Sequence, residues 1–395
     1  MSVAEPAEKP TPPWIAASAL GATQIFGFGT TYYLLGVLGG PVNAETGWPL
    51  TFMSGAQSAG MLVAGLVSPR VGRTIDRDGG RYVMSVGVAL LACGLLMLSL
   101  AQHKAVFIIG WLLMGAGMGA SLYDAAFASL GRLYGASARP AMATVTLWGG
   151  FASTVCWPLS ALLMPYLGWR GICAFYALVL LGACIPLVLW GLRGKIIPAP
   201  VVNTKTALLE SKDRPLYMLI VTTFVVLSLG MSIVYIHLIE LLQSRGLELA
   251  AAVALGALIG PGQVAARSLD LVLGHRHHPI WTYLAAVTGC AVGVTLFALD
   301  FPILSIAIVT FSAGNGVYSI VRGSLPLALF GPQKFATIIG MLARPGYIAY
   351  ALAPSVGALL IETMGADSTL KCLSVAMILN VVLVAVLASM VRRRT

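Results

Sequence analysis

The chain has 395 residues, of which 58% are hydrophobic and 10% are charged, and its formal net charge is +10. A soluble domain is about half apolar and about a quarter charged, so this composition points away from a soluble enzyme and toward a membrane protein. A nucleic-acid surface would gather basic and aromatic residues on one soluble face. The sequence has no such region, and no nucleic-acid partner is expected.

Apolar runs of roughly 20 residues recur along the chain, and this is the length at which a helix crosses a bilayer. Residues 1–13 lack the charged segment and cleavage site of a signal peptide, so the first run is expected to remain as a helix. The sequence predicts an all-α membrane protein with twelve transmembrane helices. The twelve runs lie at about 14–38, 50–69, 82–101, 105–131, 141–166, 170–192, 215–242, 249–271, 279–298, 302–329, 335–361 and 367–391.

A short, strongly charged loop is expected between the second and third runs, with the pattern Gly72-x-x-x-Asp76-x-x-Gly79-x-Arg81. This pattern strongly resembles the loop between helices 2 and 3 of major facilitator superfamily transporters. The resemblance implies two pseudo-symmetric six-helix bundles that carry a solute by alternating access. Charged residues here and after the eighth run are expected to act as a gate, because charge-assisted bonds latch neighbouring helices in one state and break in the other. The expected gating residues are Arg73, Asp76, Arg77, Arg81, Arg267 and Asp270.

Basic residues are unevenly divided between the two faces that twelve spans define. Eighteen belong to the face that carries both termini, and four belong to the opposite face. Lys and Arg accumulate in cytoplasmic segments, so both termini are expected in the cytoplasm of a bacterium, with the helices in its inner membrane.

The chain is expected to divide into two related halves. A polar stretch at 193–214 separates six-helix bundles at 14–192 and 215–391, with tails at 1–13 and 392–395. Short motifs recur at an offset near 195 residues, as expected for parallel repeats. The recurring pairs are Arg73-Thr-Ile-Asp76 with Arg267-Ser-Leu-Asp270, Gly117-Met-Gly119 with Gly314-Asn-Gly316, and Pro158 with Pro354.

Ionisable groups inside the spans are the main indication of a binding site, because each costs at least a few kcal/mol at mid-bilayer. In the family that the chain resembles, helices 1, 4, 7 and 10 line the central cavity. The substrate-binding residues expected there, or beside it on helix 11, are Arg322, Arg344, Asn315, Tyr318, Tyr347, Gln24, Thr30 and Tyr33. The proton-coupling residues expected are Asp124, His237 and Glu240. Asp124 leads this group, because an apolar cavity stabilises a protonated carboxyl.

Structural alternatives stay open for several of these residues. Asp124 and Arg322 are also consistent with a buried pair that fixes helix packing. His237 and Glu240 lie near a helix end, where both could reach water. The six cysteines fit small packing residues, although two or three of them converging in space would make a thiol site. No metal site or cofactor is expected; the histidines at 275–278 lack acidic or thiol partners.

Three motifs look most like the branch of oxalate/formate antiporters and monocarboxylate transporters: Glu45-Thr46-Gly47-Trp48, the 70–81 loop and Gly168-Trp169-Arg170. This resemblance implies a small organic anion as substrate, held by Arg344 and Arg322, with protons as the coupling ion and a monomeric carrier. Efflux of a toxic molecule such as arsenite, through Cys156, is the alternative, and a non-transporting sensor is less favoured. An enzyme is not expected, because the motifs of intramembrane hydrolases are missing.

Overall fold

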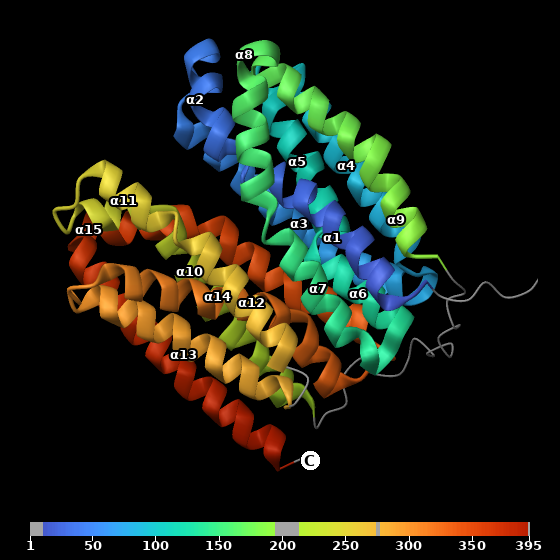
Figure 1. The fold of residues 1–395 in the computed structure, drawn as a ribbon, viewed down its shortest axis with the longest axis vertical. Helices are drawn as coiled ribbons and strands as arrows, with labels where there is room; N and C mark the ends of the chain where they lie inside the picture. The colour runs from blue at the N-terminus through green and yellow to red at the C-terminus, as the bar shows by residue number, and fades with distance from the viewer. Residues whose placement is uncertain (1–10, 194–212, 274–276, 394–395) are drawn as a thin grey trace, which may run out of the picture. The chain divides into compact units, whose positions relative to one another are not determined.

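The computed structural model describes residues 11–193, 213–273 and 277–393, and every regular element within them is a helix (Figure 1). These residues form two compact units. Unit 1 comprises residues 1–203 with Phe330–Arg344, and unit 2 comprises residues 204–329 with Pro345–Thr395. The expected linker falls mostly on residues 194–212, which lie outside the described residues.

The helices of unit 1 are α1 (Pro13–Gly29), α2 (Leu34–Thr46), α3 (Leu50–Asp78), α4 (Gly80–Ser99), α5 (Lys104–Ser121), α6 (Tyr123–Tyr134), the 3-10 turn η1 (Gly135–Ala138), α7 (Arg139–Gly149), α8 (Ala152–Val179), the π turn η2 (Leu180–Cys184) and α9 (Ile185–Gly191). Those that begin in unit 2 are α10 (Arg214–Gln243), α11 (Leu249–Gly256), α12 (Ile259–Leu273), α13 (Pro279–Ala298) and α14 (Leu304–Phe330). The last helix, α15 (Phe335–Arg392), begins in unit 1 and continues in unit 2.

The prediction of twelve membrane helices is confirmed. Nine helical stretches of the described chain are long and apolar enough to cross a membrane. One of them, Lys104–Gly191, turns at η1 and at Gly168 and so contains three spans, and Phe335–Arg392 turns at Gly365 and contains two. Both turn glycines have positive φ (59° and 81°), a backbone conformation that costs glycine little.

The charged segment between the second and third spans is not the loop that the sequence predicted. Helix α3 continues through Arg70, Arg73 and Asp76 to Asp78, and α4 starts at Gly80, so Gly79 alone joins them. Gly79 has φ 80° and its N–H binds the Ile75 carbonyl, as glycines that end helices do. Arginines are good helix formers, and no proline follows Pro69 here to stop the helix.

Positive-φ glycines strengthen the evidence for an internal repeat. They form three pairs at an offset of about 195–200 residues, each at an equivalent turn of the two halves. The pairs are Gly47 with Gly246, Gly135 with Gly331, and Gly168 with Gly365.

Small residues let the helices of unit 1 approach closely, as Gly115 and Gly119 show. A Cβ on Gly115 would overlap the backbone of Gly60 in α3, and one on Gly119 would lie 2.8 Å from the Ala64 carbonyl oxygen. Lipid supplies no hydrophobic drive between helices, so such close backbone contact is a main source of packing energy. The contact holds α3 against α5, next to the break described below.

Candidate functional site

Three of the spans in unit 1 are interrupted rather than continuous. The first breaks at residues 30–33 between α1 and α2, the fourth at Leu122 between α5 and α6, and the fifth at 150–151 between α7 and α8. Leu122 is extended, with φ −80° and ψ −167°. Hydropathy does not reveal these breaks, because each interrupts a long apolar run over only one to four residues.

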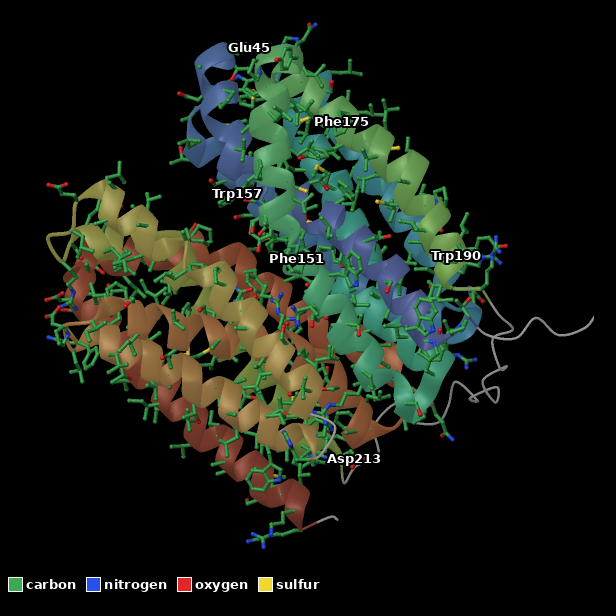
Figure 2. The ribbon with its side chains drawn as sticks, in the orientation of Figure 1. Glu45, Phe151, Trp157, Phe175, Trp190 and Asp213 are labelled. Atoms are coloured by element: carbon green, nitrogen blue, oxygen red, sulfur yellow. The ribbon has the colours of Figure 1, made fainter. Side chains whose placement is uncertain are left out.

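The three breaks lie against one another. The rings of Phe28 and Tyr123 are 4.4 Å apart, and a Cβ on Gly27 would lie 2.9 Å from the Leu122 side chain. The Tyr123 hydroxyl donates to the Thr146 carbonyl of α7 at 3.3 Å. Phe151, which Figure 2 labels, directly precedes α8 at the third break.

Glutamine side chains bind the backbone carbonyls at two of the breaks. Gln24 Nε2 donates to the Ser121 carbonyl at 2.9 Å, and Gln57 Nε2 donates to the Thr31 carbonyl at 3.0 Å. Non-helical backbone at membrane depth is tolerated only where protein or a cavity satisfies it, and interrupted helices mark the binding sites of many transporters. The Oε1 atom of Gln24 is buried and has no hydrogen-bond partner among the described residues.

Asp124 lies in the first turn of α6, directly after the break, and is 6% exposed. A carboxylate is stabilised at the N-terminal end of a helix. It lines a small hollow together with Gly72 and Ile75 of α3 and with Ala336 and Gly340 at the start of α15. The predicted proton-coupling residue therefore faces the helices that carry the charged motif.

Asp76 is the residue of that motif with the most specific contacts. Its carboxylate accepts the N–H groups of Thr337 at 2.6 Å and Ala336 at 3.3 Å, together with the Thr337 hydroxyl. Arg132 of α6 donates to the Asp76 backbone carbonyl at 3.2 Å. Asp76 thus caps the first turn of α15, where N–H groups otherwise lack partners.

The other predicted gating residues are placed differently. Arg77 pairs with its neighbour Asp78 at 2.7 Å, and 77% of its side chain is exposed. Arg73 is exposed, and the Arg81 guanidinium lies over the Tyr82 ring at 5.8 Å. Arg267, with Asp270 one turn after it, lies inside α12 and is 6% exposed.

Arg267 belongs to a polar network that joins three helices of unit 2. It donates to the Gly316 carbonyl of α14 at 3.1 Å and to Gln263 Oε1 at 3.0 Å. The Tyr235 hydroxyl oxygen then accepts from Gln263 Nε2 at 3.0 Å and from Asn315 Nδ2 at 2.7 Å. A guanidinium only donates, so it sets the orientation of the Gln263 amide. We call Tyr235, Gln263, Arg267 and Asn315 the α12 network; it contains the predicted substrate residue Asn315.

Most other predicted substrate residues are buried. Thr30 is fully buried and bonds the Phe26 carbonyl of its own helix at 2.8 Å. Tyr318 is 2% exposed and packs with Phe224 and Tyr283. The Tyr33 carbonyl accepts from Trp157 Nε1 at 3.1 Å. Gln24 is also fully buried, Tyr347 is 4% exposed and Arg322 is half-buried.

Arg344 differs from these residues. It ends the Phe335–Arg344 segment of unit 1, directly before Pro345, and its side chain is exposed. Within the described parts of the chain it has no hydrogen bond or ion pair. An arginine on an apolar helix with these properties can bind an anion.

Each unit has one cluster of ion pairs that joins the ends of neighbouring helices, which we call its ionic clamp. Neither clamp was predicted from the sequence. In unit 1, Glu45 at the end of α2 accepts Trp169 Nε1 at 2.6 Å and Arg170 Nε at 2.9 Å, and Arg170 also binds the Ser99 and Ala101 carbonyls (Figure 2). In unit 2, Arg245 pairs with Asp300 and, at 3.2 Å, with Asp367. Both halves thus have a clamp at equivalent positions, but the charges are exchanged: Glu45 corresponds to Arg245, and Arg170 corresponds to Asp367. Two motifs of the sequence resemblance, at 45–48 and 168–170, meet in the first clamp.

Both ring nitrogens of His237 in α10 have a hydrogen-bond partner. Its Nδ1 lies 3.0 Å from Glu240 Oε2, and its Nε2 lies 3.2 Å from the Pro354 carbonyl of α15. The described residues contain no group of three His, Cys, Asp or Glu side chains that could hold a metal ion. His278 instead caps α13 by accepting the Ile280 N–H, and the Cys156 thiol donates to the Ile25 carbonyl at 3.7 Å.

Comparison with known proteins agrees with this architecture. The family model of the Major Facilitator Superfamily matches residues 20–276. Comparison with curated proteins finds no match. Among solved structures, the human organic anion transporter MFSD10 (TETRAN) is similar with a TM-score of 0.77 and 17% identity, over 95% of this chain and 100% of that one. The E. coli fucose:proton symporter FucP is similar with a TM-score of 0.71 and 14% identity, over 95% and 99% of the two chains. The proton:xylose symporter XylE follows with a TM-score of 0.70 and 12% identity, over 93% and 94%.

Proposed function

Because the chain belongs to the major facilitator superfamily, we propose that it is a secondary active transporter that moves a small organic anion, such as a monocarboxylate, by alternating access. The α12 network is the observation that carries this proposal. A buried guanidinium, two amides and a phenol supply many N–H and O–H donors around one positive charge. Carboxylates are recognised by this combination of charge and donors.

Arg344 supports the same substrate class, because it is an exposed cation on an apolar helix. The shared fold does not choose a substrate, since the neighbours include an organic anion transporter as well as fucose and xylose symporters. The motifs at 45–48, 70–81 and 168–170 favour the oxalate/formate and monocarboxylate branch. We also propose that the carrier is a monomer of the bacterial inner membrane with cytoplasmic termini.

The gate in this proposal is the cap that Asp76 makes on α15. A carboxylate that holds the first turn of another helix can release it as a unit when the carrier changes state. Asp124 lies beside that cap and is the residue that we propose for proton linkage within unit 1. Arg73, Arg77, Arg81 and Asp270 are proposed to support the gate from exposed or half-buried positions.

Uptake of labelled acetate, lactate, pyruvate, oxalate and formate into proteoliposomes tests the substrate class. Arg344→Ala and Arg267→Gln are each expected to lower transport of the preferred anion at least 10-fold, because each removes a charged donor worth about 1.5–3 kcal/mol. Lys371→Ala, an exposed cation on the same helix as Arg344, is the matched control and is expected to transport normally. Full activity in both arginine variants, or arsenite export with no anion transport, would refute the anion proposal.

A further inference from the structure

The hydrogen bonds of His237 define a proton-binding site. Its Nδ1 faces Glu240 Oε2 at 3.0 Å and its Nε2 faces the Pro354 carbonyl at 3.2 Å. A carbonyl and a carboxylate only accept hydrogen bonds, whereas a neutral imidazole has one donor and one acceptor nitrogen. Both contacts form together only when the pair of side chains holds one proton beyond the neutral ring and the carboxylate.

That proton can sit in two places without breaking either contact. It makes an imidazolium that donates from both nitrogens, or a carboxyl that donates to Nδ1 of a ring protonated at Nε2. When the proton leaves, the neutral ring has two tautomers. The tautomer protonated at Nε2 keeps its hydrogen bond to the Pro354 carbonyl, but its Nδ1 lone pair faces the Glu240 carboxylate. The Nδ1–H ring keeps Glu240 but loses Pro354. The deprotonated pair therefore holds only one of its two contacts.

Among the described residues, Glu240 is the ionisable side chain that contacts the ring. On α15, residues 351–361 around Pro354 contain no ionisable side chain. Helix α11 packs on the same stretch of α10, with Gly256 near Leu238 and Ile239, and its sequence LAAAVALG has no ionisable side chain either. His237 is 12% exposed and Glu240 is 56% exposed, so the carboxylate can exchange the proton with its surroundings while the ring stays enclosed.

The imidazole ring of His237 also packs directly against Gly357 of α15. A Cβ added to Gly357 would lie 2.6 Å from His237 Nε2, so the glycine makes the room that the imidazole occupies. Pro354 lies inside α15 and lacks an N–H, which makes this turn a natural place for the helix to bend. Protonation of the pair thus acts at the Pro354 turn of α15.

We propose that His237 and Glu240 form a one-proton site that fastens α10 to the Pro354 turn of α15, and that its proton is the coupling ion of transport. The coupling rests on the proposed transport function, whereas the proton site does not. The pair is favoured as a site because the His237 ring already joins α10 to α15 through its contact with the Pro354 carbonyl.

Solution NMR of the full chain in lipid nanodiscs, with histidine labelled by ¹⁵N, tests the proton site without a substrate. His237→Gln identifies the resonances of the ring. At a pH at which the wild-type ring is doubly protonated, Glu240→Gln is expected to lower the doubly protonated fraction, because the amide places no negative charge beside the imidazolium. At about pH 9 the neutral ring is expected to carry its proton on Nε2 or Nδ1 with only the matching contact retained.

Hydrogen exchange at Ala353–Ala358 measures the contact with α15. If the neutral ring carries its proton on Nδ1, the Pro354 contact is lost, and exchange there is expected to be faster in the wild type but not in Gly357→Ala, whose added methyl group takes the space of the ring. If the neutral ring carries its proton on Nε2, exchange is expected to stay unchanged. Ser355→Ala, an exposed neighbour, is the control. A doubly protonated fraction of the His237 ring that Glu240→Gln leaves unchanged at every pH would overturn the proton site.

Transport then tests the coupling. With an anion that the wild type carries, Glu240→Gln is expected to keep exchange at equal pH and to lose at least 10-fold of the stimulation by a pH gradient. Stimulation that survives the substitution would overturn the coupling. If the wild type carries no anion of the panel, the proposed substrate class fails, and the NMR result still decides the proton site.

Discussion

Asp76 caps the first turn of α15 by accepting the backbone N–H of Thr337, which is 261 positions later in the chain. The contact joins the predicted motif after the second span to the start of the eleventh. A charged residue of the motif, near the end of α3, thus makes a specific hydrogen bond to the start of α15. Asp78 is the other carboxylate of this stretch, and within the described part of the chain it pairs only with its neighbour Arg77, so it provides a natural comparison.

Asp76→Asn should weaken this cap. The amide keeps one acceptor oxygen but places an NH₂ group where the second carboxylate oxygen accepted, and losing a charged acceptor costs about 1–3 kcal/mol. We expect transport several-fold slower and a lower midpoint of thermal unfolding in detergent. Asp78→Asn should leave both unchanged, and equal effects of the two substitutions would show that the cap on α15 has no special role.

Arg245→Ala should destabilise unit 2. The Arg245 side chain is 8% exposed and its partners Asp300 and Asp367 remain exposed, which limits the loss to about 1–3 kcal/mol. Thermal unfolding should begin several degrees lower than in the wild type. Arg77→Ala removes an exposed pair and should not change the unfolding temperature. An Arg245→Ala protein as stable as the wild type would argue against the clamp.

Gly115→Ala should separate α3 from α5. The added methyl group overlaps the backbone of Gly60, so one helix must shift, at a cost of about 1–3 kcal/mol. We expect less monodisperse protein on size-exclusion chromatography and a lower unfolding temperature. Gly40→Ala is the control, because a Cβ there would meet no atom within 4 Å. Normal behaviour of Gly115→Ala would mean that the helices tolerate a wider spacing.

Tyr235→Phe should weaken substrate binding. The hydroxyl accepts hydrogen bonds from Gln263 and Asn315, so its removal leaves two amide donors without their acceptor and loosens the α12 network. We expect the KM for the transported anion to rise about 10-fold, equivalent to about 1.4 kcal/mol, with expression unchanged. Tyr166→Phe, at a tyrosine that is 80% exposed, should leave KM unchanged. A KM equal to that of the wild type in Tyr235→Phe would remove the network from the binding site.

The sequence predicted the elements of the fold well because the bilayer imposes a length and a polarity on each of them. Twelve apolar runs became twelve spans, and the offset near 195 residues reappears in the positive-φ glycines. The arginine-rich stretch was expected as a loop and is helical up to Asp78. A high density of charge resembled a loop, whereas local helix propensity and the stop at Gly79 decided its structure.

The breaks inside the spans depend on residues far away in the chain. Leu122 interrupts the fourth span although it is as apolar as its neighbours, and the Ser121 carbonyl exposed by the break finds its donor in Gln24 of α1. A window of sequence cannot show this, because the partner lies 97 positions away. The clamp of Arg245 could not be predicted for the same reason, because its partners Asp300 and Asp367 are distant in the sequence.

The sequence by itself predicted a transporter with twelve spans and two related halves, because the length of each hydrophobic run and a local motif can be recognised in consecutive residues. Only the tertiary structure decided which polar groups meet. It brought Arg267 into a network with Tyr235 and Asn315, and it set His237 between a carboxylate and a carbonyl. Hydrogen bonds act over about 3 Å and select partners by geometry, so they form where packing brings side chains together rather than where they are adjacent in the chain.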